Sequence, residues 1–334
     1  MSNQSNSAPR LRSGAMIADV ADSNVETVSA PLGHALISVA EQDERIVGLS
    51  ADLAKYTDMH VFRDAMPDRF HQVGMAEMAL MGAAAGLAQE GFVPFASTYS
   101  VFATRRAYDW LLLDIAEQNL NVNLVCALPG LTTGYGPSHM AFEDVAILRG
   151  CPGLTIIDPC DATDIQAAVP AMAAHDGPTY LRLLRGKVPK VLHEYDGQFE
   201  LGKVRHLRDG KECLIISSGL MTERALEAAK ELEADGISVA VLHVPTLKPL
   251  DEEGILAAID AVDRPVFTAE NHSVVGGLFE SVAALLARRG GGPRISPIGL
   301  PDEFPEAGAL PTLAEKYEVN TSAIVRKVRN AQTA

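Results

Sequence analysis

The amino-acid sequence predicts an α/β protein with two open, mostly parallel-sheet domains. Short runs rich in Val, Ile and Leu alternate with longer helical patterns, as in parallel sheets that are covered by helices on both faces. The alternation breaks into a polar, glycine-containing connection over 189–210 and then restarts. With 334 residues, the chain is long enough for each domain to bury its own core.

The elements of the two domains follow one another in a regular order. A loose tail is expected over 1–25, a first domain over 26–195 and a second domain over 196–334. In the first domain, short apolar runs predict strands, and longer segments with helical spacing predict helices. The strands are expected at 46–49, 93–96, 123–128, 154–158 and 179–183, and the helices at 75–89, 106–118 and 161–174. The second domain repeats the pattern, with strands at 212–217, 238–244, 266–270 and 295–298 and helices at 222–235 and 278–289.

The charge balance bears on the partners of the protein. The chain has 28 Lys and Arg residues against 43 Asp and Glu residues, which gives a net charge of −15. Because nucleic acids and anionic membranes are themselves negative, neither is expected as the main partner. The polar N-terminus lacks the apolar core of a signal peptide, and no stretch is long and apolar enough to span a bilayer.

Cysteine usage and missing motifs exclude several classes of site. Cys126, Cys151, Cys160 and Cys213 form no C-x-x-C pair and lie at no zinc-ligand spacing from a histidine. We expect buried, reduced thiols in a cytoplasmic protein. The chain also lacks G-x-G-x-x-G, G-x-x-x-x-G-K-[ST] and G-x-S-x-G. A self-contained dinucleotide site, a phosphate-binding loop and a serine hydrolase elbow are therefore not expected.

One carboxylate is isolated in the sequence. Glu77 is the only formally charged residue of the segment FHQVGMAEMALMGAAAGLAQ, residues 70–89. A solvated helix face normally carries several charges, and an ionised carboxylate that is buried without a partner is strongly penalised. Glu77 therefore lies either at an exposed helix start or in a place where it is held for proton exchange. The small residues 83–86 allow close approach of another helix, in the core or at a subunit interface.

Three stretches of the chain resemble the C-terminal half of transketolase-like thiamine diphosphate enzymes, especially those divided over two chains. The stretches are FHQVGMAEMALMGAAAGLAQEGFVPFASTYSVFATRRAYD, then GYGPSHMAFEDVAILRGCPGLTIIDPCD, and finally VPTLKPLD followed by TAENHSVVGGLFESVAALL. The resemblance covers roughly residues 28–330 in order, and the stretches are specific when taken together. It implies a pyrimidine-binding domain followed by a transketolase C-terminal domain.

The resemblance implies roles for individual residues. Glu77 matches the catalytic glutamate that contacts the aminopyrimidine ring of thiamine diphosphate and drives its switch to the imino form by proton exchange. Phe102 matches the aromatic ring that packs on the aminopyrimidine, and Tyr99 matches a neighbouring ring. His139 matches a catalytic histidine that faces the substrate and can donate a hydrogen bond to a developing alkoxide. Asp52 matches a residue near the cofactor.

Several positions depart from the family pattern. Tyr135 replaces an Asp that usually recognises a substrate hydroxyl, and Arg105 replaces a further Tyr of many transketolases. Ser29 and Tyr56 stand where an Arg and a Ser of the family contact phosphate, so that only Arg185 matches a phosphate-binding Arg. Loss of an Arg removes a planar anion clamp, whereas added tyrosines bring apolar area with a hydrogen-bonding tip. We expect Arg185, Tyr135 and Tyr56 to bind a substrate, with an acceptor that is not a standard aldose phosphate.

The resemblance also implies a missing half. Enzymes of this family hold the cofactor's diphosphate through Mg²⁺, with a G-D-G motif followed by an Asn. This chain has no G-D-G, and none of its own residues is expected to bind a metal. The implied enzyme moves a two-carbon ketol unit from a ketose to an aldehyde. Its diphosphate and Mg²⁺ site belongs to a partner subunit, its active site lies between the chains, and two copies of each chain (α2β2) form the assembly.

Two other functions remain open. The β subunit of a 2-oxo acid dehydrogenase, or of a related decarboxylating enzyme, shares the two-domain layout and the isolated Glu. The G-P-S-H…E-D-V-A-x-L-R stretch is closer to transketolase. A non-catalytic scaffold or regulatory subunit is the third candidate, and the joint presence of Glu77, Phe102 and His139 argues against it. His272 and Lys248 also resemble family positions, and we interpret them as loop and interface structure.

Overall fold

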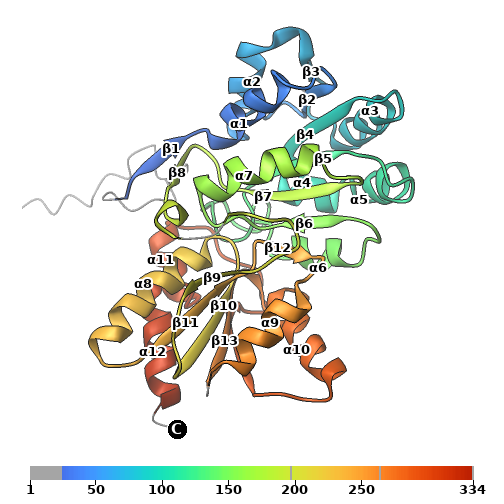
Figure 1. The fold of residues 1–334 in the computed structure, drawn as a ribbon. Coiled ribbons are helices and arrows are strands. Elements are labelled where there is room, and N and C mark those ends of the chain that lie inside the picture. The colour runs from blue at the N-terminus through green and yellow to red at the C-terminus, as the bar shows by residue number, and fades with distance from the viewer. Residues whose placement is uncertain (1–24, 196–197, 263–264, 333–334) are drawn as a thin grey trace, which may run out of the picture.

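The computed structural model describes residues 25–195, 198–262 and 265–332, so the expected tail over 1–25 lies almost wholly outside the described residues. Two large sheets form most of the molecule, one mainly from the first half of the chain and one from the second (Figure 1). Helices cover both faces of each sheet. The predicted α/β class is confirmed.

The larger sheet has seven strands in the order β12-β6-β7-β5-β4-β2-β3. All neighbouring strands are parallel except β12, which pairs antiparallel with β6. Strands such as β4 and β5 are buried along their whole length, in keeping with their mostly apolar sequences. The strands are β2 (Ile46–Ser50), β3 (Phe70–Gln72), β4 (Val93–Tyr99), β5 (Asn123–Ala127), β6 (Thr155–Ile157), β7 (Thr179–Leu183) and β12 (Thr246–Lys248).

The second sheet has five strands in the order β14-β13-β10-β11-β9, and only β9 runs antiparallel to its neighbour. These strands are β9 (Arg205–Arg208), β10 (Cys213–Ser217), β11 (Val239–His243), β13 (Val266–Ser273) and β14 (Ile295–Leu300). A separate antiparallel pair is formed by β1 (Thr27–Ser29) and β8 (Lys187–Pro189). The short edge strands β1, β3, β8, β9 and β12 escaped the sequence pattern, because three or four residues carry too little periodicity.

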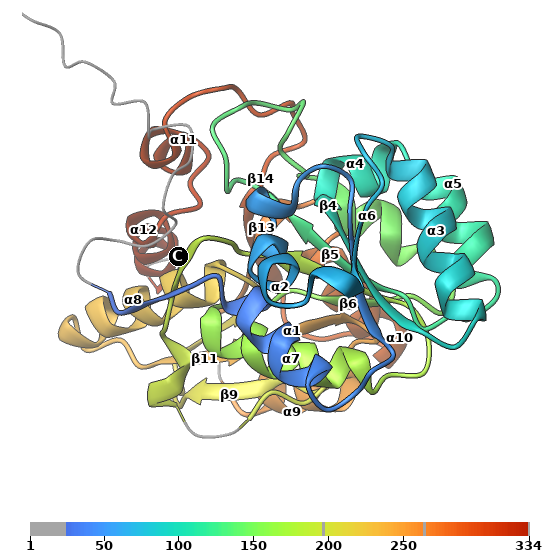
Figure 2. The same cartoon turned by 90° about the horizontal axis from the view of Figure 1, so that it is seen from above.

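The helices of the first domain cover opposite faces of the larger sheet, as the view from above shows (Figure 2). One face packs on α1 (Pro31–Ala40), α2 (Met59–Ala65) and α7 (Ala162–Ala173). The other packs on α3 (Glu77–Gln89), α4 (Ser100–Arg105), α5 (Tyr108–Trp110), the π-helical η3 (Leu111–Ala116) and α6 (Asp144–Arg149). The short 3₁₀ segments are η1 (Ala54–Tyr56), η2 (Pro67–Arg69) and η4 (Leu192–Glu194).

The prediction of one regular α-helix over 106–118 is wrong, because this range contains a short α-helix followed by a π-helical turn. The chain forms α4, α5 and η3 in succession, and the Glu117 N–H donates to the carbonyl of Leu112, five residues earlier. This wide turn buries Leu111, Ile115 and Ala116 together against α3. Inward packing of these three positions therefore overrides the regular helical period.

The second domain buries its sheet in the same way. On one face lie α8 (Met221–Ala234), α11 (Leu310–Lys316) and α12 (Thr321–Gln332), and on the other α9 (Glu252–Asp260) and α10 (Leu278–Arg289). One apolar cluster extends from α3 and α6 to α9 and α10 and joins the two domains. None of the helices in the described ranges has the length and apolarity needed to cross a membrane.

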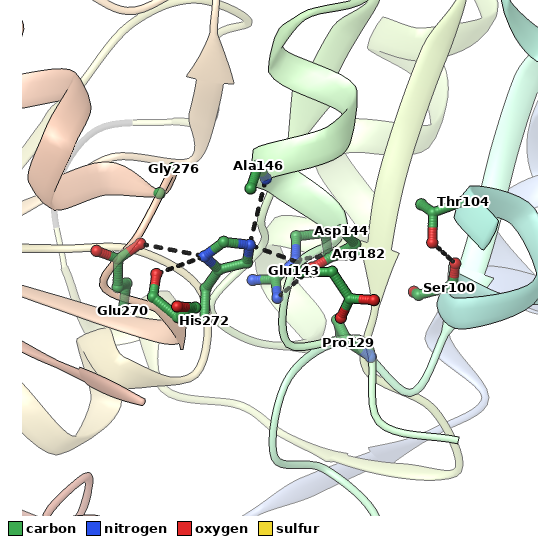
Figure 3. A network of polar contacts seen from close by, with 12 residues as sticks. Ser100, Thr104, Pro129, Glu143, Asp144, Ala146, Arg182, Glu270, His272 and Gly276 are labelled. Carbon is green, nitrogen blue, oxygen red and sulfur yellow. Dashed lines mark hydrogen bonds and ion pairs between the residues drawn. The ribbon is translucent and has the colours of Figure 1, made fainter. Parts of the chain in front are cut away.

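A buried ionic network joins the domains at the larger sheet (Figure 3). Arg182 on β7 is only 1% exposed; its Nε lies 2.9 Å from an Asp144 carboxylate oxygen and its Nη1 lies 3.0 Å from Asp158. Its Nη2 donates to the backbone carbonyl of Asn271 in β13, at 3.0 Å. A buried guanidinium requires such partners, because an unpaired charge in this place would be strongly penalised. Arg182 therefore ties the second domain to the centre of the first.

Glu270, a residue of β13, lies beside this network, and its carboxylate faces the start of α10. Its carboxylate accepts hydrogen bonds from the backbone N–H groups of Leu278 and Phe279, at 2.6 and 2.9 Å. Burial raises the pKa of the Glu270 carboxyl to about 7, and the two backbone donors oppose that shift. The raised pKa means that the folded chain retains a proton which the unfolded chain releases.

We predict that Glu270→Gln gains stability relative to the natural chain as pH rises from 4.5 towards about 7. In the natural chain the contribution of this carboxyl falls across that window, because its pKa is higher in the folded than in the unfolded state. Gln does not titrate and keeps an oxygen that caps α10. Denaturation midpoints of both proteins at pH 5 and pH 7.5 check this. A difference in stability that is the same at both pH values would contradict it.

Candidate active site at the carboxyl edge of the larger sheet

The residues that the sequence singles out all follow strands of the parallel sheet. Asp52 and Tyr56 come after β2, Glu77 after β3, Tyr99 and Phe102 at and after the end of β4, Tyr135 and His139 after β5, and Arg185 after β7. Because these strands are parallel, their carboxyl ends meet at one edge of the sheet. This edge is the usual ligand-binding edge of open α/β sheets.

Four rings form a cluster at this edge. The centroid of the His139 ring lies 5.5 Å from Phe102, 6.0 Å from Tyr99 and 5.3 Å from Tyr135. Tyr99 and Phe102 are themselves 5.6 Å apart. The edge-on and tilted arrangements are those that aromatic rings prefer. The structure thus brings together four of the residues that the sequence predicted for the site.

Glu77 is connected to this ring cluster through Arg106. Glu77 begins α3 and is 4% exposed, and its Oε1 accepts a hydrogen bond from Nη1 of Arg106 at 3.1 Å. The guanidinium carbon of Arg106 lies 4.0 Å from the centroid of the Phe102 ring. The expectation of an exposed helix start is wrong, because the start of α3 is buried and the Glu77 carboxylate is paired with Arg106.

Arg106 is not among the residues that the sequence predicts for the site. The signal was its position four residues after Phe102, which places both side chains on the same side of a helical turn. Its neighbour Arg105 points elsewhere: it donates to Glu143 and to the carbonyl of Pro137, and its guanidinium carbon lies 5.6 Å from the Phe142 ring centroid. Spacing distinguishes these two arginines, whereas residue type does not.

His139 is set up as a neutral imidazole. Its Nδ1 lies 3.0 Å from Oγ of Ser138. Burial lowers the pKa of His139, and the positive charge of Arg106 lowers it further. A neutral imidazole carries one N–H donor and one lone pair, so His139 can donate one hydrogen bond and accept another at the same time.

Arg185 lies near Tyr56 and Tyr99. Its guanidinium carbon is 6.0 Å from the Tyr56 ring, and its charge opposes the rise that burial causes in the pKa of Tyr99. Nε of Arg185 is buried and has no hydrogen-bond partner within the described part of the chain. The next residue, Gly186, donates its N–H to both oxygens of Asp58, whose pKa burial raises to about 6. Arg185 thus places a cation with an unused donor at the edge.

Two further predicted positions lie apart from the rings. Asp52 adopts a left-handed backbone conformation (φ 59°), and its N–H donates to Oε1 of Gln72 at 2.7 Å. Ser29 lies in β1 opposite Lys187 of β8. Lys248 and His272 hold backbone groups instead: Lys248 donates to the carbonyls of Arg149 and Cys151.

Metal-ligating side chains do not gather at this edge. Over 25–195, 198–262 and 265–332, no group of three or more His, Cys, Asp and Glu side chains is arranged to hold a metal ion. The four cysteines are buried and form no disulfide with one another. The arrangement can therefore bind a flat ring between a carboxylate and an aromatic face, with a neutral histidine and a cation nearby.

Comparisons with known proteins agree with this layout. Models of the transketolase pyrimidine-binding domain and the transketolase C-terminal domain match residues 26–190 and 202–324. A transketolase family protein of Sinorhizobium fredii is 62% identical over 322 residues, which cover 96% of this chain and 93% of the relative. The 6-deoxy-6-sulfo-D-fructose transketolase subunit of a Clostridium species is 41% identical over 292 residues, 87% of this chain and 90% of that one. A solved split-gene transketolase, described as an inactive β4 tetramer, matches with a TM-score of 0.82 at 38% identity, over 92% of this chain and 99% of that chain.

Proposed function

This chain belongs to the transketolase family, and we propose that it forms, with a second kind of chain, a thiamine diphosphate enzyme that transfers a two-carbon ketol unit from a ketose to an aldehyde. The observation that carries the proposal is the buried Glu77 at the carboxyl edge of the sheet, joined to the face of Phe102 through Arg106. The cofactor, when bound, supplies the carbanion chemistry of the transfer. The residues of this chain bind and orient the cofactor ring and the substrate, and they exchange protons with them.

The residues at the edge fit the aminopyrimidine ring. The guanidinium of Arg106 is planar, donates an N–H to Glu77 and lies against Phe102. A planar heteroaromatic ring with an exchangeable ring proton can make the same contacts as this guanidinium: it donates a hydrogen bond to Glu77 and stacks on Phe102. We infer that Glu77 holds and exchanges that proton and that Phe102 and Tyr99 orient the ring. The Arg106 side chain, which is half exposed, has room to turn towards solvent.

His139 and Asp52 complete the proposed contribution of this chain. His139 projects from the segment after β5 onto Phe102 and Tyr99, so its free donor can reach an oxygen that becomes negative during the transfer. A preorganised donor of this kind stabilises charge without reorganising solvent. Asp52 lies at the same edge, and we propose it as a further contact to the cofactor.

The partner chain, in this proposal, holds the diphosphate and Mg²⁺. The relative from Clostridium is named as a subunit, and the split-gene transketolase of β chains alone is described as inactive. Both names support a need for a second kind of chain. We propose an α2β2 assembly in the cytoplasm, with the active site between the chains.

Reconstitution tests the proposed function. The purified chain alone should neither bind thiamine diphosphate tightly nor turn over. Both properties should appear when a chain with a G-D-G motif and Mg²⁺ is added. Tight cofactor binding and turnover by this chain alone would overturn the shared site. Release of carbon dioxide from 2-oxo acids, without ketol transfer, would favour the decarboxylating alternative.

The substrate end of the site has unusual residues. Tyr135, Tyr56 and Arg185 lie near Tyr99. Within the described residues, Nε of Arg185 donates to no partner. One cation and two phenol groups suit a substrate with a single anionic group and more apolar surface than an aldose phosphate. The name of the Clostridium relative specifies a sulfonated ketose, and a ketose is the donor in ketol transfer, so the name supports an anion other than phosphate on the donor side. We propose an acceptor that is not a standard aldose phosphate.

Tyr135→Asp should raise kcat/KM for glyceraldehyde 3-phosphate, because it supplies the carboxylate that accepts a hydrogen bond from the 2-hydroxyl group. A hydrogen bond to a charged group is worth roughly a tenfold change or more. The matched control is Tyr135→Phe, which keeps the ring and adds no acceptor, and it should bring no gain. Steady-state assays with a panel of aldehydes measure this. If the natural chain already uses ribose 5-phosphate or glyceraldehyde 3-phosphate as well as any other acceptor, the proposed specificity is wrong.

A further inference from the structure

The segment 129–143, which carries Tyr135 and His139, is built into the second domain. Figure 2 shows it running beside the loop that precedes α11. Leu131 and Met140 are buried in the apolar cluster that fills the space between the second sheet and α8, α11 and α12. At its tip, the Gly308 N–H donates to the carbonyl of Gly134 at 3.0 Å. The catalytic segment thus packs on a domain that supplies none of the proposed catalytic side chains.

The side chain of Asn271 in β13 hydrogen-bonds to the start of this segment, at residues 129–131. Its Oδ1 accepts a hydrogen bond from the N–H of Leu131 at 2.9 Å, and its Nδ2 donates to the carbonyl of Pro129 at 3.4 Å. Gly130, between them, has a φ of 55°, and a Cβ built on it would lie 1.9 Å from the backbone oxygen of Asn271. Only glycine allows so close an approach in this conformation.

Backbone hydrogen bonds connect residues 128–130 with Ala141, close to His139. The Gly130 N–H donates to the carbonyl of Ala141 at 2.7 Å, and the Ala141 N–H donates to the carbonyl of Leu128 at 3.4 Å. Ala141, two residues after His139, is therefore hydrogen-bonded to residues 128–130, next to the backbone groups that Asn271 binds. Asn271 is fixed in its turn, because its own carbonyl accepts the hydrogen bond from Arg182.

We propose that Asn271 is a positioning residue that holds the His139 imidazole against Phe102 and Tyr99. The inference rests on the proposed function, in which His139 faces the substrate. Asn271 is 2% exposed, and its side-chain amide bonds to backbone groups of Pro129 and Leu131, so its effect on the site is indirect. A positioned donor has to be held within fractions of an ångström to act. The second domain thereby contributes to the site without entering it.

The test is an NMR titration of His139 in the full-length chain, with the resonance assigned by its loss in His139→Gln. In the natural chain the pKa of His139 is lowered by burial against the neighbouring rings. In Asn271→Ala the freed segment should expose the imidazole, and the pKa should rise towards 6.5. Amide exchange at Leu131 should rise roughly tenfold, as expected for loss of one hydrogen bond.

A second variant approaches the same contact from the other side. Gly130→Ala inserts a methyl group against the Asn271 carbonyl and should raise the pKa of His139 in the same direction. The matched control is Thr222→Val, which removes a buried hydrogen bond to His243 elsewhere in the second domain. It should lower stability and leave His139 unchanged.

The outcomes separate this inference from the proposed function. An unchanged His139 titration in a folded Asn271→Ala or Gly130→Ala variant, or an equal change in Thr222→Val, would overturn the positioning role. Full turnover of His139→Gln in the assembled enzyme would overturn the function of His139 and leave the titration results as they are. A raised pKa in both loop variants, absent from the control, supports the positioning role.

Discussion

Replacing Glu77 with Gln is expected to lower the turnover number of the assembled enzyme by ~10²–10⁴-fold, the range typical of lost general acid–base assistance. Gln keeps the shape of the side chain and an oxygen that accepts a hydrogen bond, so the start of α3 should be preserved. It cannot take up and release a proton, which is the role proposed for Glu77 towards the cofactor ring. The kcat at saturating substrate and cofactor is the measurement.

The same substitution at the other end of the helix is the control. Glu90 follows α3 and is exposed, so Glu90→Gln should leave the turnover number unchanged. Circular dichroism and assembly with the partner chain verify that both variants are folded. If Glu77→Gln turned over like the natural enzyme, the chain would be better described as a scaffold subunit.

Replacing Arg182 with Leu is expected to lower the free energy of unfolding by about 3–5 kcal/mol, which is the usual cost of removing one partner of a buried ion pair. The variant would leave the carboxylates of Asp144 and Asp158 buried without their cation. It would also remove the hydrogen bond to the carbonyl of Asn271, and with it a connection between the domains. Chemical denaturation of the isolated chain measures the loss.

The direction of its pH dependence follows from the same charges. Burial raises the pKa of Asp158, and the Arg182 guanidinium opposes that rise. Without Arg182, the folded chain should retain protons that the unfolded chain releases, so the variant should lose still more stability as pH rises from acid to neutral. Arg289→Leu, which removes a partly exposed pair with Asp260, should cause a much smaller loss. Equal losses in the two variants would argue against a central role for Arg182.

The regular part of the fold was accessible from local sequence. The strand expected at 179–183 and the helix at 278–289 coincide with β7 and α10, because uninterrupted apolar runs and helical spacing are local signals. Short edge strands such as β12 were not accessible. The partner of β12 is β6, about 90 positions earlier in the chain, and only the packing of the two domains brings them together.

The site divides in the same way. The positions of Glu77, Phe102 and His139 were accessible because each lies in a motif that resembles a family pattern. The pairing of Arg106 with Glu77 was not accessible, because the two residues are 29 positions apart and meet only where the helices pack.

Local sequence was enough to predict the α/β class, the order of the two domains and the family. These properties depend on periodicity and on short motifs, which are written in neighbouring residues. The pairing of Arg106 with Glu77, the burial of Arg182 between the domains and the hydrogen bonds from Asn271 to the segment of His139 are visible only in three dimensions. The hydrogen bond from Leu131 to Asn271 spans 140 positions. Such contacts depend on how two packed domains meet, and no local pattern records that geometry.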